Sequence, residues 1–414
     1  MRNRVHYVLA TLLISGLVAG VGAVSASAAA APGSLDPTFG HDGIVLADVG
    51  GEPVATDAIL QSNGDIVVAD QYGLVRFLPS GSLDPTFGDD GVALTGFNDE
   101  GLGPSGVAIQ PNGQILWVGD TTKPDGVGGI ITDFAVARFN ANGTLDSSFG
   151  TGGLVTTEFF TDPLQGAMEL AESVLVQPNG DILVGGVARQ GQNKEAPYLG
   201  ALARFTPSGT LDSTFGTGGQ VLSSSLPTIT AIGLDAAGDI FVLPAETELT
   251  SAGHIDSTVT PAAITASSTG GAAAFLPGGR YVIGQTVGVG KHDDEVQVEY
   301  FKAGGTLAAA SPEFHYTGTT GEDGANAVAV QPNRQAVVGG SHFLATSIFG
   351  LARVNTNGSL DTTFGNAGTV TTDIQGDDGI GALVIQPNGD IVAAGTSENN
   401  TTGQVDMALA RYIG

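Results

Sequence analysis

Short apolar stretches of four or five residues alternate with polar turns along almost the whole chain. In the clearest copy, an apolar stretch ends at the turn Gln177-Pro178-Asn179-Gly180, and a second stretch, 182 to 185, follows it. Proline presets φ at the second position of a turn and glycine accepts positive φ, so this pattern predicts two strands joined by a short hairpin. Further copies of the turn lie at 61 to 64, 110 to 113, 235 to 238, 276 to 279, 331 to 334 and 386 to 389.

Two other markers recur with the same spacing. A strand typified by residues 202 to 205 recurs at 74 to 77, 136 to 139, 247 to 250, 298 to 301, 351 to 354 and 409 to 412. A motif of the form Gly-Ser-Leu-Asp-Pro-Thr-Phe-Gly occupies 33 to 40 and 81 to 88, with other copies around Asp146, Asp212, Asp256, Leu307 and Asp361. We interpret the motif as one helical turn, in which Asp36 caps the first end and Gly40 closes the second in the left-handed conformation. Leu35 and Phe39, four residues apart, are then expected to share one face and to fill the gap between neighbouring units.

Each unit therefore supplies four strands: A before the Pro-Asn-Gly turn, B after it, C with the Ala-Arg-Phe pattern, and D after the motif. The chain begins with a D strand and ends with A, B and C, so pairing 44 to 48 with 409 to 412 would complete the last unit. This offset predicts an all-β fold, a seven-bladed β-propeller of four-stranded antiparallel blades that forms a single domain over residues 31 to 414. A solenoid is the alternative repeat architecture, but its ends normally carry polar caps.

The three markers together resemble the delta-60 repeat domain, a bacterial repeat. The resemblance rests on Gln-Pro-Asn-Gly, Leu-Ala-Arg-Phe and Asn-Gly-Ser-Leu-Asp-Thr-Thr-Phe-Gly at 357 to 365, and it covers about residues 33 to 414. It implies a β-propeller and carries over no catalytic residue. Residues 229 to 317 depart most from the pattern, so the number of blades is least secure there.

Residues 1 to 30 have the pattern of a secretory signal peptide. Arg2 and Arg4 precede an apolar run from Tyr7 to Val24, and small residues follow it. We expect cleavage after Ala28 or Ala30 and a secreted, extracellular protein, at most loosely associated with the cell surface. An uncleaved anchor is the alternative, because the run approaches the length of a membrane span. The chain has no cysteine, so no disulfide supports the exported fold.

The composition is acidic, with 42 Asp and Glu against 14 Lys and Arg and a formal net charge of −28. Nucleic acid and anionic membranes are therefore expected to be poor partners, and no membrane insertion is expected after cleavage. Solubility outside the cell is one explanation of this charge. Binding of a hard divalent cation such as Ca²⁺ is the other, because clustered carboxylates repel one another until a cation neutralises them.

Topology places these carboxylates on one face. In a four-stranded blade the B to C and D to A connections share a face, and the repeated turns lie on the other. The predicted ligand-binding residues are the acidic pairs before strand A, namely Asp99, Glu100, Glu322, Asp323, Asp377 and Asp378. Glu322, Asp323, Asp377 and Asp378 are also the candidate calcium ligands, although Asp and Gly also simply form turns.

Other residue types add little chemistry. His292 beside residues 293 to 295 could offer imidazole and carboxylates together, or be a solvated loop. Trp117 fits the packing pattern of strand B, and the recurring arginines are expected to pair with the motif aspartates. These recurring residues are Arg76, Arg138, Arg204, Arg353 and Arg411. No zinc-protease helix, nucleophile elbow or phosphate loop is present in the sequence.

The sequence thus predicts a binding or scaffold module. We expect a monomer that presents its variable loops to an extracellular protein or a cell-surface glycan. The alternative is an extracellular hydrolase or lyase that acts on polysaccharide with acidic residues at the channel mouth, which would require a carboxylate pair across that mouth.

Overall fold

The computed structural model describes residues 30–97, 106–124, 130–160, 167–191, 196–226, 228–244, 247–256, 268–290, 293–318, 321–343 and 345–414. The chain divides into residues 1–30 and a compact unit, residues 31–414. The predicted signal peptide lies outside the described residues, except for Ala30. In the part of the chain that is described, no helix has the length and apolar character needed to cross a bilayer.

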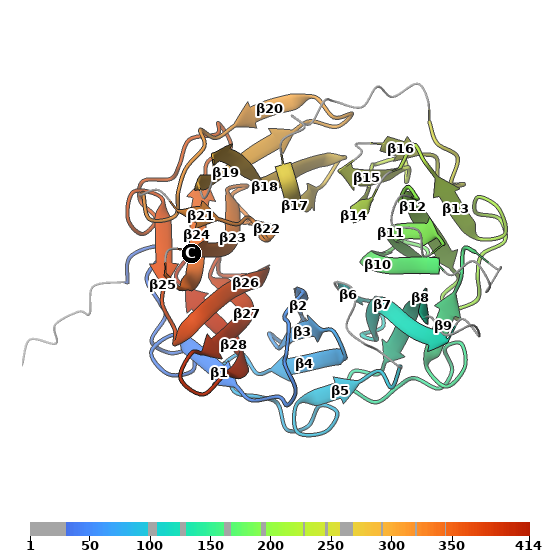
Figure 1. Ribbon diagram of the computed structural model, residues 1–414, viewed down its shortest axis with the longest axis horizontal. Coiled ribbons are helices and arrows are strands. Elements are labelled where there is room, and N and C mark those ends of the chain that lie inside the picture. Colours follow the sequence, from blue (N-terminus) through green and yellow to red (C-terminus); the bar gives the residue numbers. More distant parts are fainter. Residues whose placement is uncertain are drawn as a thin grey trace, which may run out of the picture. The chain divides into compact units, whose positions relative to one another are not determined.

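The compact unit is a β-propeller whose sheets stand side by side around a common centre, with strand A of each sheet innermost (Figure 1). Blade 1 contains β2 (Asp57–Leu60), β3 (Ile66–Asp70), β4 (Gly73–Phe77) and β5 (Val92–Leu94). Blade 2 contains β6 (Gly106–Ile109), β7 (Ile115–Pro124), β8 (Ile130–Phe139) and β9 (Leu154–Thr157). Blade 3 contains β10 (Ala167–Val176), β11 (Ile182–Gln190), β12 (Leu199–Phe205) and β13 (Gln220–Ser223).

The divergent segment also folds into blades. Blade 4 has three described strands, β14 (Ile229–Leu234), β15 (Ile240–Pro244) and β16 (Thr247–Leu249). Blade 5 contains β17 (Ser268–Leu276), β18 (Arg280–Gly290), β19 (Asp293–Phe301) and β20 (Leu307–Ala310). Blade 6 contains β22 (Ala327–Val330), β23 (Ala336–Phe343), β24 (Ser347–Val354) and β25 (Thr369–Thr372). The short strand β21 (Glu322–Asp323) pairs with both β19 and β23 and so joins blades 5 and 6.

The predicted closure is confirmed. Blade 7 contains β26 (Gly376–Ile385), β27 (Ile391–Asn399), β28 (Gln404–Tyr412) and the N-terminal strand β1 (Ile44–Ala47). β1 pairs antiparallel with β28, with Ile44 opposite Ala410. Four further backbone bonds hold the ends together, among them those from the Gly33 N–H to the Ile413 carbonyl at 2.8 Å and from the Ile413 N–H to the Ser34 carbonyl at 2.9 Å. The chain therefore forms seven blades among the described residues, and both ends contribute to the last one.

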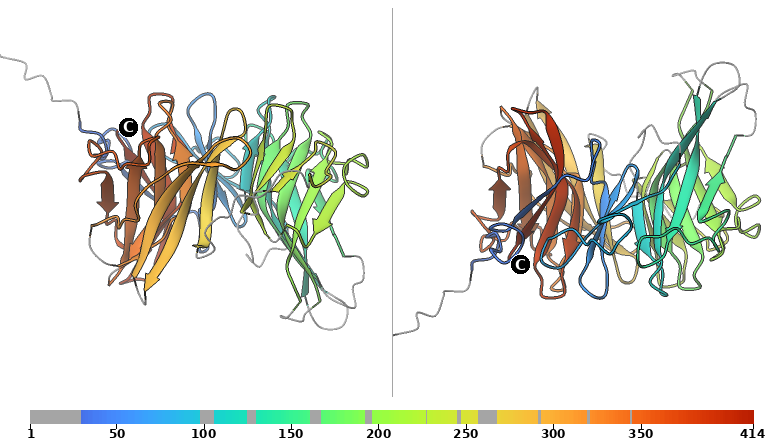
Figure 2. Two further views of the ribbon diagram at one scale, coloured as in Figure 1. Left: turned by 90° about the horizontal axis from the view of Figure 1, so that it is seen from above. Right: turned by 90° about the horizontal axis from the view of Figure 1, so that it is seen from below.

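In blades 2 and 7, strands B and C stay paired well beyond the middle of the blade. β7 and β8 remain paired from Ile115 opposite Phe139 to Pro124 opposite Ile130, and β27 and β28 remain paired to Asn399 opposite Gln404. Antiparallel pairing can continue beyond the sheet core even where the side chains are polar, because the hydrogen bonds of the ladder join backbone groups. Figure 2 shows hairpins that project beyond the body of the sheets.

The motif turn is capped as predicted, but its packing differs from the prediction. The Asp36 Oδ1 accepts hydrogen bonds from the Thr38 N–H and hydroxyl at 2.9 and 2.7 Å, and Gly40 has φ of 54°. Leu35 and Phe39 do not share a face: Leu35 packs in the core between blades 6 and 7, and Phe39 packs between blades 7 and 1. The segment is a β-bridge followed by a turn, with Leu35 opposite Tyr412, so helical spacing does not apply to it. Each motif therefore contacts two interblade cores.

The recurring arginines pair with the motif aspartates, as predicted. The Arg138 Nε lies 2.9 Å from the Asp146 Oδ2, and its guanidinium stacks 4.5 Å from the centre of the Phe149 ring. The Nη1 of Arg138 donates to the Pro207 carbonyl in the next blade. The corresponding arginines of blades 1, 3, 6 and 7 repeat the ion pair and the stacking. This arrangement ties each of these motifs to the rest of its blade.

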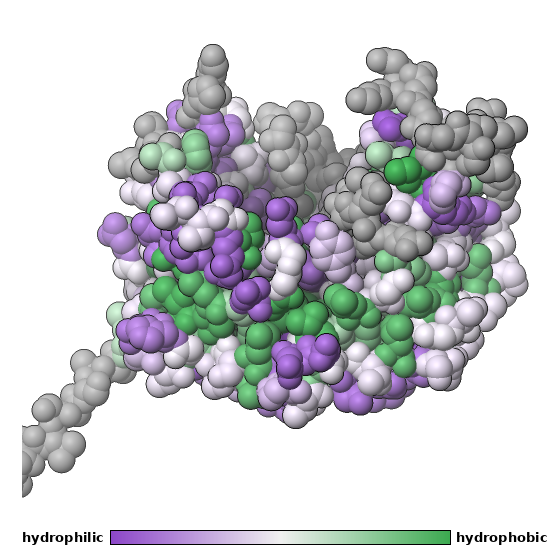
Figure 3. Space-filling model, turned by 60° about the horizontal axis from the view of Figure 1, so that its bottom comes forward, coloured by the Kyte–Doolittle hydropathy of each residue, from purple (hydrophilic) through white to green (hydrophobic). Residues whose placement is uncertain are grey.

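The core lies between adjacent sheets. Trp117 is buried between blades 1 and 2 and donates its Nε1–H to the Asp70 carbonyl at 2.9 Å, which confirms its predicted packing role. On the side that Figure 3 shows, hydrophobic residues form a band bordered by hydrophilic residues. Some of the apolar surface belongs to D strands, where Leu46 and Leu94 are exposed.

Candidate functional site

Two of the three predicted acidic pairs lie in strands rather than in loops. Glu322 and Asp323 form β21, and Asp377 and Asp378 belong to the beginning of β26. Neighbouring residues of a strand point to opposite sides, so one member of each pair enters the blade. Asp323 and Asp378 are accordingly buried, whereas Glu322 and Asp377 are half-buried. Asp99 and Glu100 lie outside the described residues.

Asp323 is held between two histidines. The Nδ1 atoms of His315 and His342 lie 2.6 and 2.7 Å from the Asp323 carboxylate oxygens. Burial raises the pKa of Asp323, although the two histidine hydrogen bonds oppose that shift. The other ring nitrogen of His315 lies 3.4 Å from Asp293 and 3.3 Å from Glu295. His315 thus lies beside two of the acids of residues 293 to 295. The predicted partner of these acids, His292, lies outside the described residues.

Asp378 and Glu169 occupy the same position in their blades and hold the D to A connections. Asp378 accepts hydrogen bonds from the Ser397 hydroxyl and from the Ile374 N–H, the second at 2.7 Å. Glu169 accepts from the backbone of Phe159 and Phe160 at 2.9 to 3.0 Å. Burial raises the pKa of Glu169 to about 8. Asp323 and Asp378 thus have partners within their own sheets, and calcium binding at the predicted residues stays a prediction.

The A strands surround a central channel with a volume of about 400 Å³. Polar side chains from four blades line it, namely Thr56, Asp57, Glu172, Ser173, Thr230 and Asn326, and its other lining residues are apolar or glycine. Glu172 and Thr230 lie at β-bulges, where the strand places an extra residue opposite its neighbour. A bulge changes the direction of a side chain, and the side chains of Glu172 and Thr230 consequently line the channel.

Two carboxyl groups make the channel chemically distinct. Burial raises the pKa of Asp57 to about 6, although hydrogen bonds from the Val107 and Ala58 N–H groups oppose that shift. Burial alone raises the pKa of Glu172 to about 7. Glu172 has no hydrogen-bond or ion-pair partner within the part of the chain that the structure describes. Among the described residues, no lysine or arginine lines the channel. The channel can therefore accept a positively charged group.

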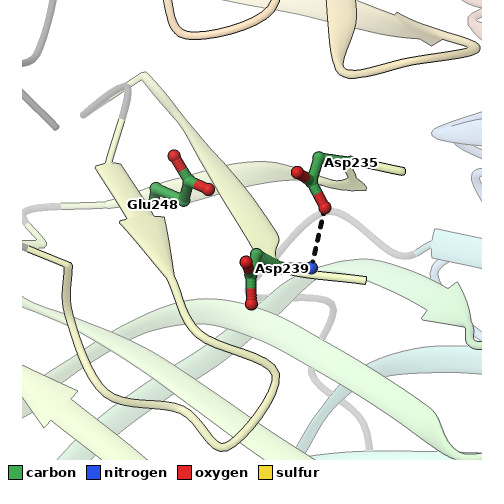
Figure 4. A group of neighbouring side chains, drawn as sticks. All are labelled: Asp235, Asp239 and Glu248. Carbon is green, nitrogen blue, oxygen red and sulfur yellow. Dashed lines mark hydrogen bonds between the residues drawn. The ribbon is translucent and has the colours of Figure 1, made fainter. Parts of the chain in front are cut away.

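A second acidic group lies in blade 4, at the turn end of its strands. Ligand atoms of Asp235, Asp239 and Glu248 all lie within 4.8 Å of one another. Figure 4 shows the three carboxylates and the 2.9 Å hydrogen bond from the Asp239 N–H to Asp235. Burial and then the charges of nearby aspartates raise the pKa of Glu248. Carboxylate oxygens at this spacing are suitable ligands for a divalent cation.

The repeat explains why this group carries so much negative charge. Glu248 lies opposite Phe241 in its ladder, in the place that Arg204 occupies opposite Leu183 in blade 3. Blade 4 therefore has a carboxylate where five other blades have a guanidinium. An alignment of the repeats could have identified this position, whereas no sequence signal marks Glu172, whose role depends on a bulge.

Comparisons with known proteins support the fold. Residues 61–87, 110–149, 177–215 and 331–364 match a family model described as "Domain of unknown function (DUF5122) beta-propeller". A search of curated proteins found no match.

Among solved structures, virginiamycin B lyase from Staphylococcus aureus is similar at 11% identity over 89% of this chain and 98% of that one, with a TM-score of 0.45. An alpha-L-arabinanase from Penicillium chrysogenum is similar at 11% identity over 86% and 93%, with a TM-score of 0.43. A gluconolactonase from Xanthomonas campestris is similar at 12% identity over 92% and 96%, with a TM-score of 0.41. Similarity at this level carries no information on activity or substrate.

Proposed function

We propose that the propeller is a secreted binding module whose partner is an extracellular protein that inserts a basic side chain into the central channel. The supporting observation is Glu172, a carboxylate in a cavity of about 400 Å³ with no partner within the described residues. Removing a carboxylate from water without a partner is unfavourable, and a cation that enters the channel relieves that cost.

The lining of the channel favours an alkylammonium group over a hydrated metal ion. Ala231, Val328 and Leu383 offer apolar walls, and Glu172 offers one free carboxylate. A lysine side chain matches this arrangement, because its methylene stem packs on apolar surface while its ammonium group meets the carboxylate. Calcium instead requires 6 to 8 oxygen ligands. The acidic surface of the protein also attracts basic partners over a distance.

Calorimetric titration with n-butylammonium and with a tetralysine peptide tests the proposal. We expect binding to the wild-type protein at about pH 8, and at least about tenfold weaker binding to Glu172→Gln, since one charge-assisted contact is lost. Glu398→Gln is the control, because it removes the same charge from a half-buried residue of β27. Equal effects of the two substitutions, or tighter binding of Ca²⁺ than of butylammonium, would contradict the proposal.

The pH dependence gives a second measurement. With a pKa of about 7 for Glu172, the ionised fraction falls about thirtyfold between about pH 8 and about pH 5.5. Asp57 is the other titratable group that lines the channel, and its pKa of about 6 adds to the same trend. Affinity for butylammonium is therefore expected to fall as the pH falls, and affinity that is independent of pH would count against the role of Glu172.

One observation favours a second candidate function, hydrolysis or elimination of polysaccharide. A carboxyl group that is protonated near neutral pH can act as a general acid, and both Asp57 and Glu172 line the channel with raised pKa values. Release of new reducing ends from a polysaccharide panel by the wild-type protein, and its loss in Glu172→Gln, would support this candidate. Absence of release would leave binding as the function to pursue.

A further inference from the structure

Basic side chains are scarce in this protein, and most of those described have partners. The recurring arginines pair with the motif aspartates, and Lys123 lies 2.6 Å from Asp133 and 2.9 Å from Glu158. Arg189 stacks 4.6 Å from the centre of the Tyr198 ring. Three basic residues differ from these: Arg280, Lys302 and Arg334 form neither an ion pair nor a stack on an aromatic ring with any residue that the structure describes.

These three residues line a single recess between blades 5 and 6, at the turn end of the strands. The recess has a volume of about 610 Å³. Leu276, Phe301 and Ala308 contribute apolar surface to it, and its lining contains no carboxylate from the part of the chain that the structure describes. Arg280 follows the turn of blade 5, Arg334 lies in the turn of blade 6, and Lys302 follows strand β19. In a protein of net charge −28, three unpaired cations thus converge on one cavity.

The backbone at Arg334 gives an independent indication. Arg334 has φ of 73°, in the left-handed region, whereas the equivalent turns of blades 1, 3 and 7 have Gly64, Gly180 and Gly389 with φ of 90° to 96°. A side chain is disfavoured in this conformation, because its Cβ approaches the backbone. Blade 6 therefore carries a cationic side chain where glycine would fit the turn better, and strained residues of this kind concentrate at functional sites.

The acidic group of blade 4 lies close by but does not neutralise the recess. Asp235 packs against Gly279, the neighbour of Arg280. Asp235, Asp239 and Glu248 form no ion pair with Arg280 among the described residues. The guanidinium of Arg280 instead donates to the Pro277 carbonyl at 3.4 Å, which is a long hydrogen bond that leaves its other donors available.

We propose that Arg280, Lys302 and Arg334 form a binding site for an oxyanion, a sulfate or phosphate ester carried by an extracellular sugar. Guanidinium groups present a planar set of donors that binds such oxygens in pairs, and the ammonium of lysine adds a mobile charge. Asn333 and Thr356 line the same recess and offer polar groups to sugar hydroxyls. The site lies at the turn end of the strands, so it is separate from the hairpins that project at the other end.

Calorimetric titration with inorganic sulfate, inorganic phosphate, a sulfated heparin hexasaccharide and anionic phospholipid vesicles tests this site. We expect the hexasaccharide to bind, with affinity that falls as salt is added. Arg280→Gln and Arg334→Gly are each expected to weaken binding at least about tenfold. Arg334→Gly also relieves the strain of the left-handed backbone at this position, so the melting temperature of this variant should not fall. Weak binding by this variant then cannot be attributed to misfolding.

Arg189→Gln is the control, because it removes the same charge from a residue outside the recess. Weakening by Arg189→Gln equal to that by Arg280→Gln would overturn the proposal, since it would indicate attraction by overall charge. Absence of binding by all four probes would also overturn it. Binding of the inorganic ions with the same dependence on Arg280 and Arg334, but none of the hexasaccharide, would overturn the assignment to a sugar. Preference for the vesicles would identify a lipid headgroup and likewise overturn that assignment.

Discussion

Replacing Arg138 by methionine would remove the guanidinium from one motif and keep most of the side-chain volume. The ion pair with Asp146 is buried, with both side chains at most 10% exposed. Removing one partner of a buried pair costs about 3 to 5 kcal/mol. Asp146 keeps hydrogen bonds from the Ser148 N–H and hydroxyl at 3.0 and 2.8 Å, so its charge is not left without partners. We therefore expect Arg138→Met to lower the free energy of unfolding by about 3 kcal/mol, the lower end of this range.

The expected change in melting temperature follows from the size of the unit. An unfolding entropy of roughly 2 cal/mol/K per residue gives about 0.8 kcal/mol/K for residues 31–414, so the melting temperature should fall by about 4 °C. Differential scanning calorimetry measures this shift. A double-mutant cycle with Asp146→Asn would isolate the interaction between the two side chains, and we expect a coupling of about 1.5 to 3 kcal/mol.

Arg189→Met is the matched control for this prediction. Arg189 stacks on Tyr198 at 4.6 Å, much as Arg138 stacks on Phe149 at 4.5 Å, but it forms no ion pair with a described carboxylate. We expect its substitution to cost less than about 1 kcal/mol. If Arg138→Met and Arg189→Met lowered the melting temperature equally, stacking rather than ion pairing would stabilise the motif, and the reasoning given above would be refuted.

Three further predictions concern pH, charge and closure. Burial raises the pKa of Glu169 to about 8, so the folded protein loses stability as the pH rises from about 4.5 to about 8 and this carboxyl group must ionise. The Glu169→Gln variant should therefore melt at the same temperature as the wild type at about pH 5, and at a higher temperature than the wild type at about pH 8.5. The substitution Glu248→Arg places a guanidinium beside the carboxylates of Asp235 and Asp239, and it should raise the melting temperature in low salt by about 1 to 2 °C. An unchanged melting temperature would indicate that these acids already bind a cation. A variant without residues 31–48 lacks β1, which leaves β28 with an unpaired edge. This variant should therefore elute as aggregates in size-exclusion chromatography. A monodisperse, folded product would show that the pairing of β1 with β28 is dispensable.

The sequence predicted those parts of the fold that depend on recurrence. The offset between the ends of the chain implied that β1 would complete blade 7, and Arg138 with Asp146 could be paired because both residues recur together. Features that depend on exact backbone geometry were not predictable in this way. Leu35 and Phe39 were assigned one face because the motif was interpreted as helical, whereas the segment is a bridge and a turn.

The candidate sites were harder to predict for the same reason. Asp323 and Asp378 could be placed before strand A, but their burial follows from the continuation of the ladders through these residues, which polarity did not reveal. Glu172 reaches the channel because of a bulge. Arg280 follows the turn of blade 5 and Arg334 ends the turn of blade 6, and the repeat pattern does not show that neighbouring turns face one recess, so their convergence became visible only in three dimensions.

The pairing of β1 with β28 also sets an order of events during synthesis. Among the described strands of the propeller, β1 leaves the ribosome first and its partner β28 leaves last. No partly made polypeptide can therefore complete the circle, and the sealing contacts must form late and across the greatest separation in the chain, where loop-closure entropy slows folding. Until β28 has been made, the backbone groups of β1 that will pair with it form an unpaired strand edge.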